Sequence, residues 1–330
     1  MHQPPIPFLD RLAHIVGVQS LGRVPLRAMW TEVFAAHSDE DIEEQLAAGA
    51  PQTTPALAAV STEWPRPWVF SRLLVLALAV YGIFLLAWSN TGNRNLIPGL
   101  ILTGSFAAPV STLVLFFECN VRRNVAMYQV LRLALVGGVL ALLLSLFMYR
   151  IGDAFPIQWL GTSMAGLVEE PAKLLTLVLV INNPRFRYIL NGLLLGAAVG
   201  AGFAAFESAG YAFRAGLEGG SMAMRDVILM RGLLAPFTHC VWTAMTAGAL
   251  WRVKRDAPFA WRMVQEPRFC RVLASAVVLH MIWDFDLDLP ADLLHLLVGL
   301  AGWFMVACLV QEGLEEIRVE QALYGHPSHG

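Results

Sequence analysis

Residues 69–88 are VFSRLLVLALAVYGIFLLAW, an apolar stretch whose only charged side chain, Arg72, lies near its start. The hydrocarbon core of a bilayer is about 30 Å thick, so an α-helix needs about 20 mainly apolar residues to cross it. This stretch meets the requirement. It predicts a helix that spans a membrane.

The composition of the whole chain points the same way. The 330 residues are 57% hydrophobic and 15% charged, whereas a soluble domain is about 25% charged. The sequence has no long patch of one charge sign, so nothing in it indicates nucleic acid as a partner. Eight stretches approach the length of a span, and together they predict an all-α, polytopic bundle of about eight transmembrane helices. They are residues 69–88, 96–117, 133–149, 157–181, 188–213, 232–251, 272–289 and 293–310.

The distribution of Lys and Arg predicts the orientation. With the N-terminus inside, thirteen basic residues lie at cytoplasmic ends and loops and five lie on the opposite side. The positive-inside rule therefore places both termini in the cytoplasm. The five outer residues are Arg94, Arg150, Arg214, Arg225 and Arg231, and we expect the last of these to extend to the outer interface.

We expect three regions along the chain. Residues 1–68 form a cytosolic extension and linker, 69–312 a membrane domain whose motif-bearing core is 155–290, and 313–330 a cytosolic tail. In the extension, Ser38 is a candidate N-cap for a short helix that Gly49 would end. The extension could dock on the membrane domain, bind a regulator, or be a poorly ordered tail.

Ionisable residues within the predicted spans gather in four of them. Such residues cost several kcal/mol at membrane depth on insertion scales and usually belong to functional sites. They are Glu169, Glu170 and Lys173 in 157–181, Glu207 in 188–213, His239 in 232–251, and His280 with Asp284 in 272–289. At about 1.5 Å of helix rise per residue, these groups reach similar levels in the outer half of the bilayer. A shared polar cavity would satisfy them together.

Spacing within each helix supports this convergence. Lys173 follows the two glutamates by four and three positions, so one ammonium can pair with either carboxylate. His280 and Asp284 are four apart, as are Glu207 and Tyr211. A separate set of small residues, Gly192, Gly196, Gly200 and Gly202, predicts a seam where two helices pack closely.

Hydrolysis of a peptide bond needs a water, a base and donors for the oxyanion. Glu169 or Glu170 could be the base, with the other as acid or electrostatic partner and Lys173 tuning both. His239 and His280 could position the water, steady the oxyanion or hold a metal. Two histidines with one of Glu170 or Glu207 would suit a catalytic zinc, although HExxH is absent. A proton-coupled transporter could also use such groups, and a non-enzymatic binding or immunity-type protein could share the scaffold.

The ordered motifs resemble the PrsW family of intramembrane proteases, which is related to the CAAX-prenyl-protease superfamily. The resemblance is carried by Glu169-Glu170-Pro-Ala-Lys173, Phe206-Glu207 with Tyr211, Pro236-Phe-Thr-His239, and His280 with Trp283 and Asp284. Asp284 stands where the family commonly has asparagine, which leaves its role open.

The resemblance implies a protease that cuts peptide bonds of membrane proteins in or near the bilayer. It implies a metalloprotease or a glutamate-dependent enzyme, with Glu169, Glu170, Glu207, His239 and His280 as catalytic residues and Lys173, Tyr211 and Asp284 in support. The founding type cuts an anti-sigma factor at an extracytoplasmic site. A prokaryotic inner membrane is the location that the family implies.

Overall fold

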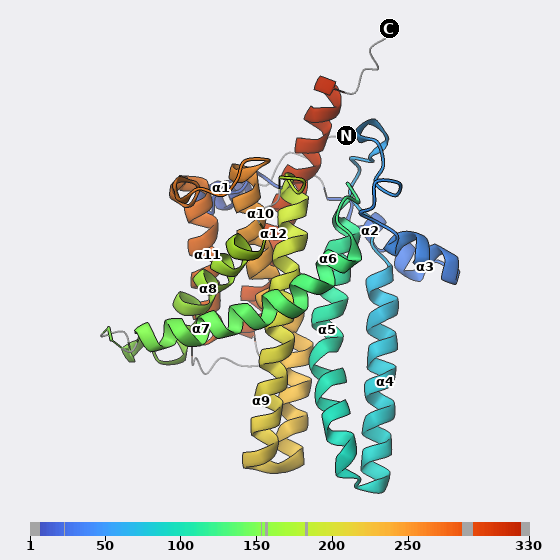
Figure 1. Ribbon diagram of the computed structural model, residues 1–330, viewed down its shortest axis with the longest axis vertical. Helices are drawn as coiled ribbons and strands as arrows, with labels where there is room; N and C mark the ends of the chain where they lie inside the picture. The colour runs from blue at the N-terminus through green and yellow to red at the C-terminus, as the bar shows by residue number, and fades with distance from the viewer. Residues whose placement is uncertain are drawn as a thin grey trace.

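The computed structural model describes residues 7–22, 24–152, 154–155, 158–181, 184–285 and 293–324 (Figure 1). Every regular element within these ranges is a helix, which confirms the predicted all-α class. Residues 286–292, part of the predicted span 272–289, and residues 325–330 of the predicted tail lie outside the described residues.

Each predicted span corresponds to a helical segment. These are α4 (Val69–Thr91), α5 (Ile97–Cys119), α6 (Met127–Arg132) continuing through a π-helical turn (Leu133–Gly137) into α7 (Gly138–Gly152), α8 (Met164–Val180), α9 (Ile189–Leu234), α10 (His239–Lys254), α11 (Pro267–Trp283) and α12 (Leu293–Tyr324). In the described part of the chain, five segments are long and apolar enough to cross a membrane. Helices α8 and α11 have 17 residues each, or about 25 Å, so the count of eight spans stays a prediction.

The segment Ile189–Lys254 doubles back on itself. Gly220 has φ +77° inside α9, a left-handed conformation that glycine adopts without steric cost. Gly192 packs against Trp251, Gly200 against His239, and Gly216 against Met224. These pairs are nearly symmetric about Gly220, so the two arms form an antiparallel hairpin, visible in Figure 1 as two neighbouring helices. Three residues of the predicted glycine seam, Gly192, Gly196 and Gly200, lie along this contact, whereas Gly202 packs against Ala134.

Two hydrophobic clusters hold the bundle together. The larger surrounds α9 and α10 and includes Leu194, Trp242 and Trp251. A smaller one, with Tyr81 and Ile228 among its members, joins α4 and α5 to the arms near Gly220. Figure 1 shows α4, α5 and the hairpin extending at one end beyond α8 and α11. The four motif-bearing segments therefore meet partway along the hairpin.

Span 157–181 is shorter in the structure than predicted. The α-helix begins at Met164, and residues Gln158–Ser163 form a 3₁₀ segment. Gly161 breaks that segment with φ +56°, and Thr162 Oγ1 donates to the carbonyl of Asp284 at 2.5 Å. This hydrogen bond connects the segment before α8 to the end of α11.

The extension is folded against one end of the bundle. It contains α1 (Pro7–Ile15), α2 (Leu26–Met29) and α3 (Asp39–Leu46). Ser38 caps α3 as predicted, and its backbone N–H, which donates to Asp41, lowers the pKa of that carboxyl.

Backbone contacts attach the extension and lead it into the membrane domain. The Glu118 carboxylate on α5 accepts from the N–H groups of Trp68, Val69 and Phe70, and Gly49 donates to the carbonyl of Arg123 at 2.9 Å. At the other end of the chain, α12 runs unbroken to Tyr324, across the predicted boundary at 312.

Candidate functional site

Helix α8 supplies the acidic pair and the lysine. Its residues Glu169, Glu170 and Lys173 are all buried. Pro171 follows the pair inside the helix and has no N–H to donate, which loosens the backbone there. Because consecutive helical residues differ by about 100° in direction, the two carboxylates face different neighbours.

Lys173 is the centre of the buried charges. Its Nζ lies 2.6 Å from Glu170 Oε1, 3.7 Å from Glu169 Oε2 and 2.9 Å from His239 Nδ1. The ammonium also lies 4.4 Å from the centre of the Phe203 ring. A fully buried ammonium requires such partners. One lysine therefore links α8 to α9 and α10.

His280 comes from the last turn of α11. Its Nδ1 lies 2.8 Å from Glu170 Oε1, and its Nε2 lies 3.2 Å from Asp284 Oδ2. The ring stacks on Trp242 at 4.5 Å. Two carboxylates and an indole thus fix the imidazole, and the predicted contact between His280 and Asp284 is present.

His239 is the first residue of α10 and directly follows an interruption of the helix. Ala235–Phe237 is a 3₁₀ turn, and Thr238 is non-helical (φ −116°, ψ −128°). Pro236 lacks an N–H, and Trp303 Nε1 donates to its carbonyl at 2.9 Å. The break places the imidazole at a helix end, where it can reach both α8 and α9.

Glu207 on α9 holds the other side of His239, with its Oε2 3.0 Å from His239 Nε2. Arg231, on the returning arm of the hairpin, also pairs with Glu207 and donates to Ser208 Oγ at 2.9 Å. Its guanidinium lies 4.4 Å from the Tyr211 ring. Arg231 therefore turns into the site instead of extending to the outer interface. The signal that could have found it is the hairpin register, since 207 and 231 are almost symmetric about Gly220.

These groups border a cavity of about 300 Å³. Its lining includes Tyr149, Glu169, Glu207, His239, His280, Asp284, Tyr211 and Arg231. The pair Glu170 and Lys173 lies behind this wall. Tyr149 of α7, which we did not predict as a site residue, donates to Glu169 Oε1 at 3.2 Å.

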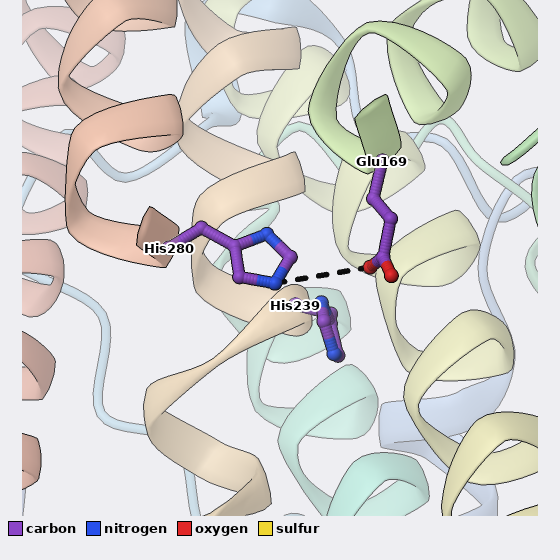
Figure 2. A group of neighbouring side chains, drawn as sticks. All are labelled: Glu169, His239 and His280. Atoms are coloured by element: carbon purple, nitrogen blue, oxygen red, sulfur yellow. Dashed lines mark ion pairs between the residues drawn. The ribbon is translucent and has the colours of Figure 1, made fainter. Parts of the chain in front are cut away.

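Three of the lining residues form a group able to hold a metal ion. One ligand atom from each of Glu169, His239 and His280 lies within 4.8 Å of the others. Figure 2 shows the three side chains converging from α8, α10 and α11. Glu169 Oε2 is buried and has no hydrogen-bond partner in the described part of the chain. Its neighbours Lys173 Nζ and His280 Nε2 lie at 3.7 and 3.8 Å.

Residues 122–310 match the sequence profile described as PrsW family intramembrane metalloprotease. The match covers more than half of the chain and contains all four motifs. The chain belongs to the PrsW family of intramembrane metalloproteases. It is therefore an intramembrane peptidase. No curated protein and no solved structure matches the chain.

The donor set fits the metal that the family description implies. Catalytic zinc takes three protein ligands, of which two histidines and one glutamate are a known combination, and keeps one position for water. The unpartnered oxygen of Glu169 is suited to coordination. In the structure this glutamate accompanies the two histidines, whereas the sequence favoured Glu170 or Glu207. Those two carboxylates are engaged by Lys173 and Arg231 respectively.

Proposed function

We propose that this PrsW-family peptidase hydrolyses a peptide bond of a membrane-protein substrate in the cavity beside Glu169. The observation that carries the proposal is the position of Glu169 Oε2, which is buried, has no hydrogen-bond partner among the described residues and lies next to two imidazoles. An oxygen in this environment can accept a proton from a water held in the cavity. Of the two adjacent glutamates, Glu169 is thus the catalytic carboxylate.

Glu170 is a positioning residue in this proposal. It accepts from Lys173 and contacts His280 Nδ1. His280 Nε2 then faces Asp284 at 3.2 Å and Glu169 at 3.8 Å. The Lys173 ammonium lies 2.6 Å from Glu170 Oε1 and 3.7 Å from Glu169 Oε2, so it offsets the negative charge of both carboxylates. Removal of Glu170 would release both partners and disturb Glu169 indirectly.

The remaining lining groups act on the water and on the developing oxyanion. His239 and His280 position the water, and the Tyr149 hydroxyl orients Glu169 through its hydrogen bond. Arg231 holds Glu207, and Glu207 in turn fixes the His239 ring. Donors that are fixed before the reaction stabilise developing charge without reorganisation.

Glu169, His239 and His280 are the residues that would hold a zinc ion. When bound, zinc lowers the pKa of its water toward 7 and polarises a carbonyl. With zinc bound, Glu169 would be the carboxylate ligand, as the geometry of the three side chains supports. Glu169 acts as the base only where no metal is bound.

By analogy with the founding type of the family, we propose a substrate of the anti-sigma-factor class, cut on the extracytoplasmic side of a prokaryotic inner membrane. The site would lie in the outer half of the bilayer with both termini in the cytoplasm. Residues 1–68 and the end of α12 would then be cytosolic.

The test compares Glu169→Gln with wild type on a membrane-anchored reporter peptide in proteoliposomes. Glu218→Gln, an exposed glutamate of the hairpin outside the cavity, is the matched control. We expect Glu169→Gln to lower the cleavage rate at least about 100-fold, the size of a lost general base, and the control to cleave normally. Cleavage by Glu169→Gln at the wild-type rate would refute the assignment.

A further inference from the structure

A second cavity lies between α4, α5 and α12. Its volume is about 430 Å³. Mainly apolar side chains of α4, α5 and α12 line the cavity, and residues 29–67 of the extension contribute the rest of its lining together with Pro236 and Phe237. The lining includes Trp30, Trp64, Leu74, Leu115, Phe237 and Ala307. None of these residues lines the cavity at Glu169.

The helices that line this cavity indicate that lipid surrounds it. Helices α4, α5 and α12 are all long and apolar enough to span a membrane, so their outward faces meet hydrocarbon chains. Trp30 lines the cavity and is 49% exposed, which shows that the cavity reaches the surface of the molecule. Apolar cavities exclude water and take up apolar molecules. A lipid acyl chain is the apolar molecule at hand.

One polar atom, the indole nitrogen of Trp64, indicates that the ligand also carries a hydrogen-bond acceptor. Trp64 lines the cavity, and its indole Nε1 is buried without a hydrogen-bond partner in the described residues. A buried donor left unpaired costs about 1–3 kcal/mol. Trp64 lies four positions before Trp68, the residue that precedes α4. At this end of a membrane helix, the ester carbonyls of a glycerophospholipid lie beside its acyl chains and accept hydrogen bonds.

We propose that this cavity binds one glycerophospholipid, with an acyl chain between α5 and α12 and an ester oxygen accepting from Trp64 Nε1. The site has a structural connection to the catalytic group, because Pro236 and Phe237 line it and directly precede Thr238 and His239. Phe237 also packs against Gly299 of α12. The proposal does not depend on the catalytic assignment.

The experiment counts phospholipids retained by the full chain. Wild-type protein is equilibrated with 1-palmitoyl-2-oleoyl phosphatidylglycerol in detergent, stripped by washing, and examined by native mass spectrometry. Two variants test the cavity: Ala307→Phe fills it, and Trp64→Phe removes the donor and keeps an aromatic, although smaller, ring. Leu78→Phe is the matched control, because Leu78 is 52% exposed on α4 and does not line the cavity.

We expect one retained phospholipid in wild type and in Leu78→Phe, none in Ala307→Phe, and retention about fivefold weaker in Trp64→Phe, the effect of one lost hydrogen bond. Circular dichroism and thermal unfolding establish that each variant is folded. The proposal is overturned if folded wild type retains no phospholipid. It is also overturned if Ala307→Phe retains as much as Leu78→Phe.

Discussion

Glu169 and Glu170 are neighbours in the sequence, yet their carboxylates have different surroundings. Glu170 contacts Lys173 and His280 at 2.6 and 2.8 Å and lies behind the cavity wall. Glu169 lines the cavity and keeps one oxygen without a hydrogen-bond partner among the described residues. Sequence spacing alone left these roles interchangeable, because Lys173 can reach both positions on a helix. The distinction arises because Glu170 has Lys173 and His280 of α11 as close partners, whereas Glu169 has Tyr149 of α7.

The group formed by Glu169, His239 and His280 predicts that each chain binds one metal ion. Protein purified without chelators should contain about one zinc per chain, and His239→Ala and His280→Ala should lose it, because a catalytic zinc needs three protein ligands. Glu170→Gln should lower the zinc affinity roughly 10- to 100-fold, as expected for a residue that orients a ligand. Elemental analysis of the folded wild type and of the three variants measures the zinc content of each.

His37→Ala is the control for this measurement, since His37 stacks on Trp68 in the extension, away from the cavity. It should retain zinc. A wild-type preparation that cleaves its substrate while metal-free would contradict the metal assignment and favour a water activated by Glu169 alone. Metal retained in both site-histidine variants would contradict the ligand set.

Arg231 provides a second test at the level of single residues. Arg231→Gln leaves Glu207 in contact with His239 but without the guanidinium that holds the carboxylate, so the imidazole is held less firmly. We expect a 10- to 100-fold loss of kcat/KM, the usual cost of small misplacement in a site, and a loss of roughly 1–3 kcal/mol in unfolding free energy. The latter is below the value for a fully buried pair, because the Arg231 side chain is 30% exposed.

Arg231→Lys should recover part of the activity, because it keeps the charge but lacks the fork that contacts both Glu207 and Ser208. Arg225→Gln, on the same arm and outside the cavity lining, is the control and should cleave normally. Equal activity of Arg231→Gln and Arg225→Gln would show that Glu207 does not need the guanidinium. Cleavage kinetics and thermal unfolding together separate the catalytic from the structural effect.

At the scale of helices, the contact of α9 with α10 sets the position of His239. A Cβ added at Gly200 would lie 2.3 Å from the carbonyl oxygen of His239. Gly200→Ala should therefore push the start of α10 away and cost about 1–3 kcal/mol of stability, as overpacking does. Cleavage should fall with it. Thermal unfolding and reporter cleavage measure the two effects.

Gly210 offers a control in the same helix, because a Cβ there meets no atom within 4 Å. Gly210→Ala should be neutral or stabilise the protein by about 0.5–1 kcal/mol, since alanine favours a helix more than glycine. If both alanines had the same effect, the position of α10 would not depend on this contact.

The helices were largely predictable from the sequence, because the length of an apolar stretch is a local property. The motif residues were predictable too, since buried charges are rare in such stretches. Arg231 and Tyr149 were not, because their roles depend on the hairpin at Gly220 and on the packing of α7 against α8. The start of the helix in span 157–181 was missed because the backbone conformation of Gly161 (φ +56°) interrupts the 3₁₀ segment that precedes Met164. Long-range register is the information that one sequence lacks.

On the scale of the whole molecule, the two ends of the bundle differ. The extension and the later part of α12 lie at one end, and the turn between α4 and α5 lies at the other (Figure 1). Gln321 donates to the carbonyls of Leu57 and Val60, which joins the two terminal regions. Both regions must therefore be on the same side of the membrane. The excess of basic residues at this end predicts that it is the cytoplasmic side.

Thiol labelling from outside decides the orientation. Cys270, near the start of α11, is exposed at the end that we assign to the cytoplasm, and Asn93 lies exposed in the turn between α4 and α5. In sealed cells that express the chain, a membrane-impermeant maleimide should label Asn93→Cys in a Cys270→Ser background. It should label wild-type Cys270 only after the membrane is permeabilised. The reverse pattern would place the cavity toward the cytoplasmic leaflet, and cleavage would then have to release the substrate on that side. Labelling of Cys270 and Asn93→Cys alike in sealed cells would mean mixed insertion, which the charge distribution does not predict.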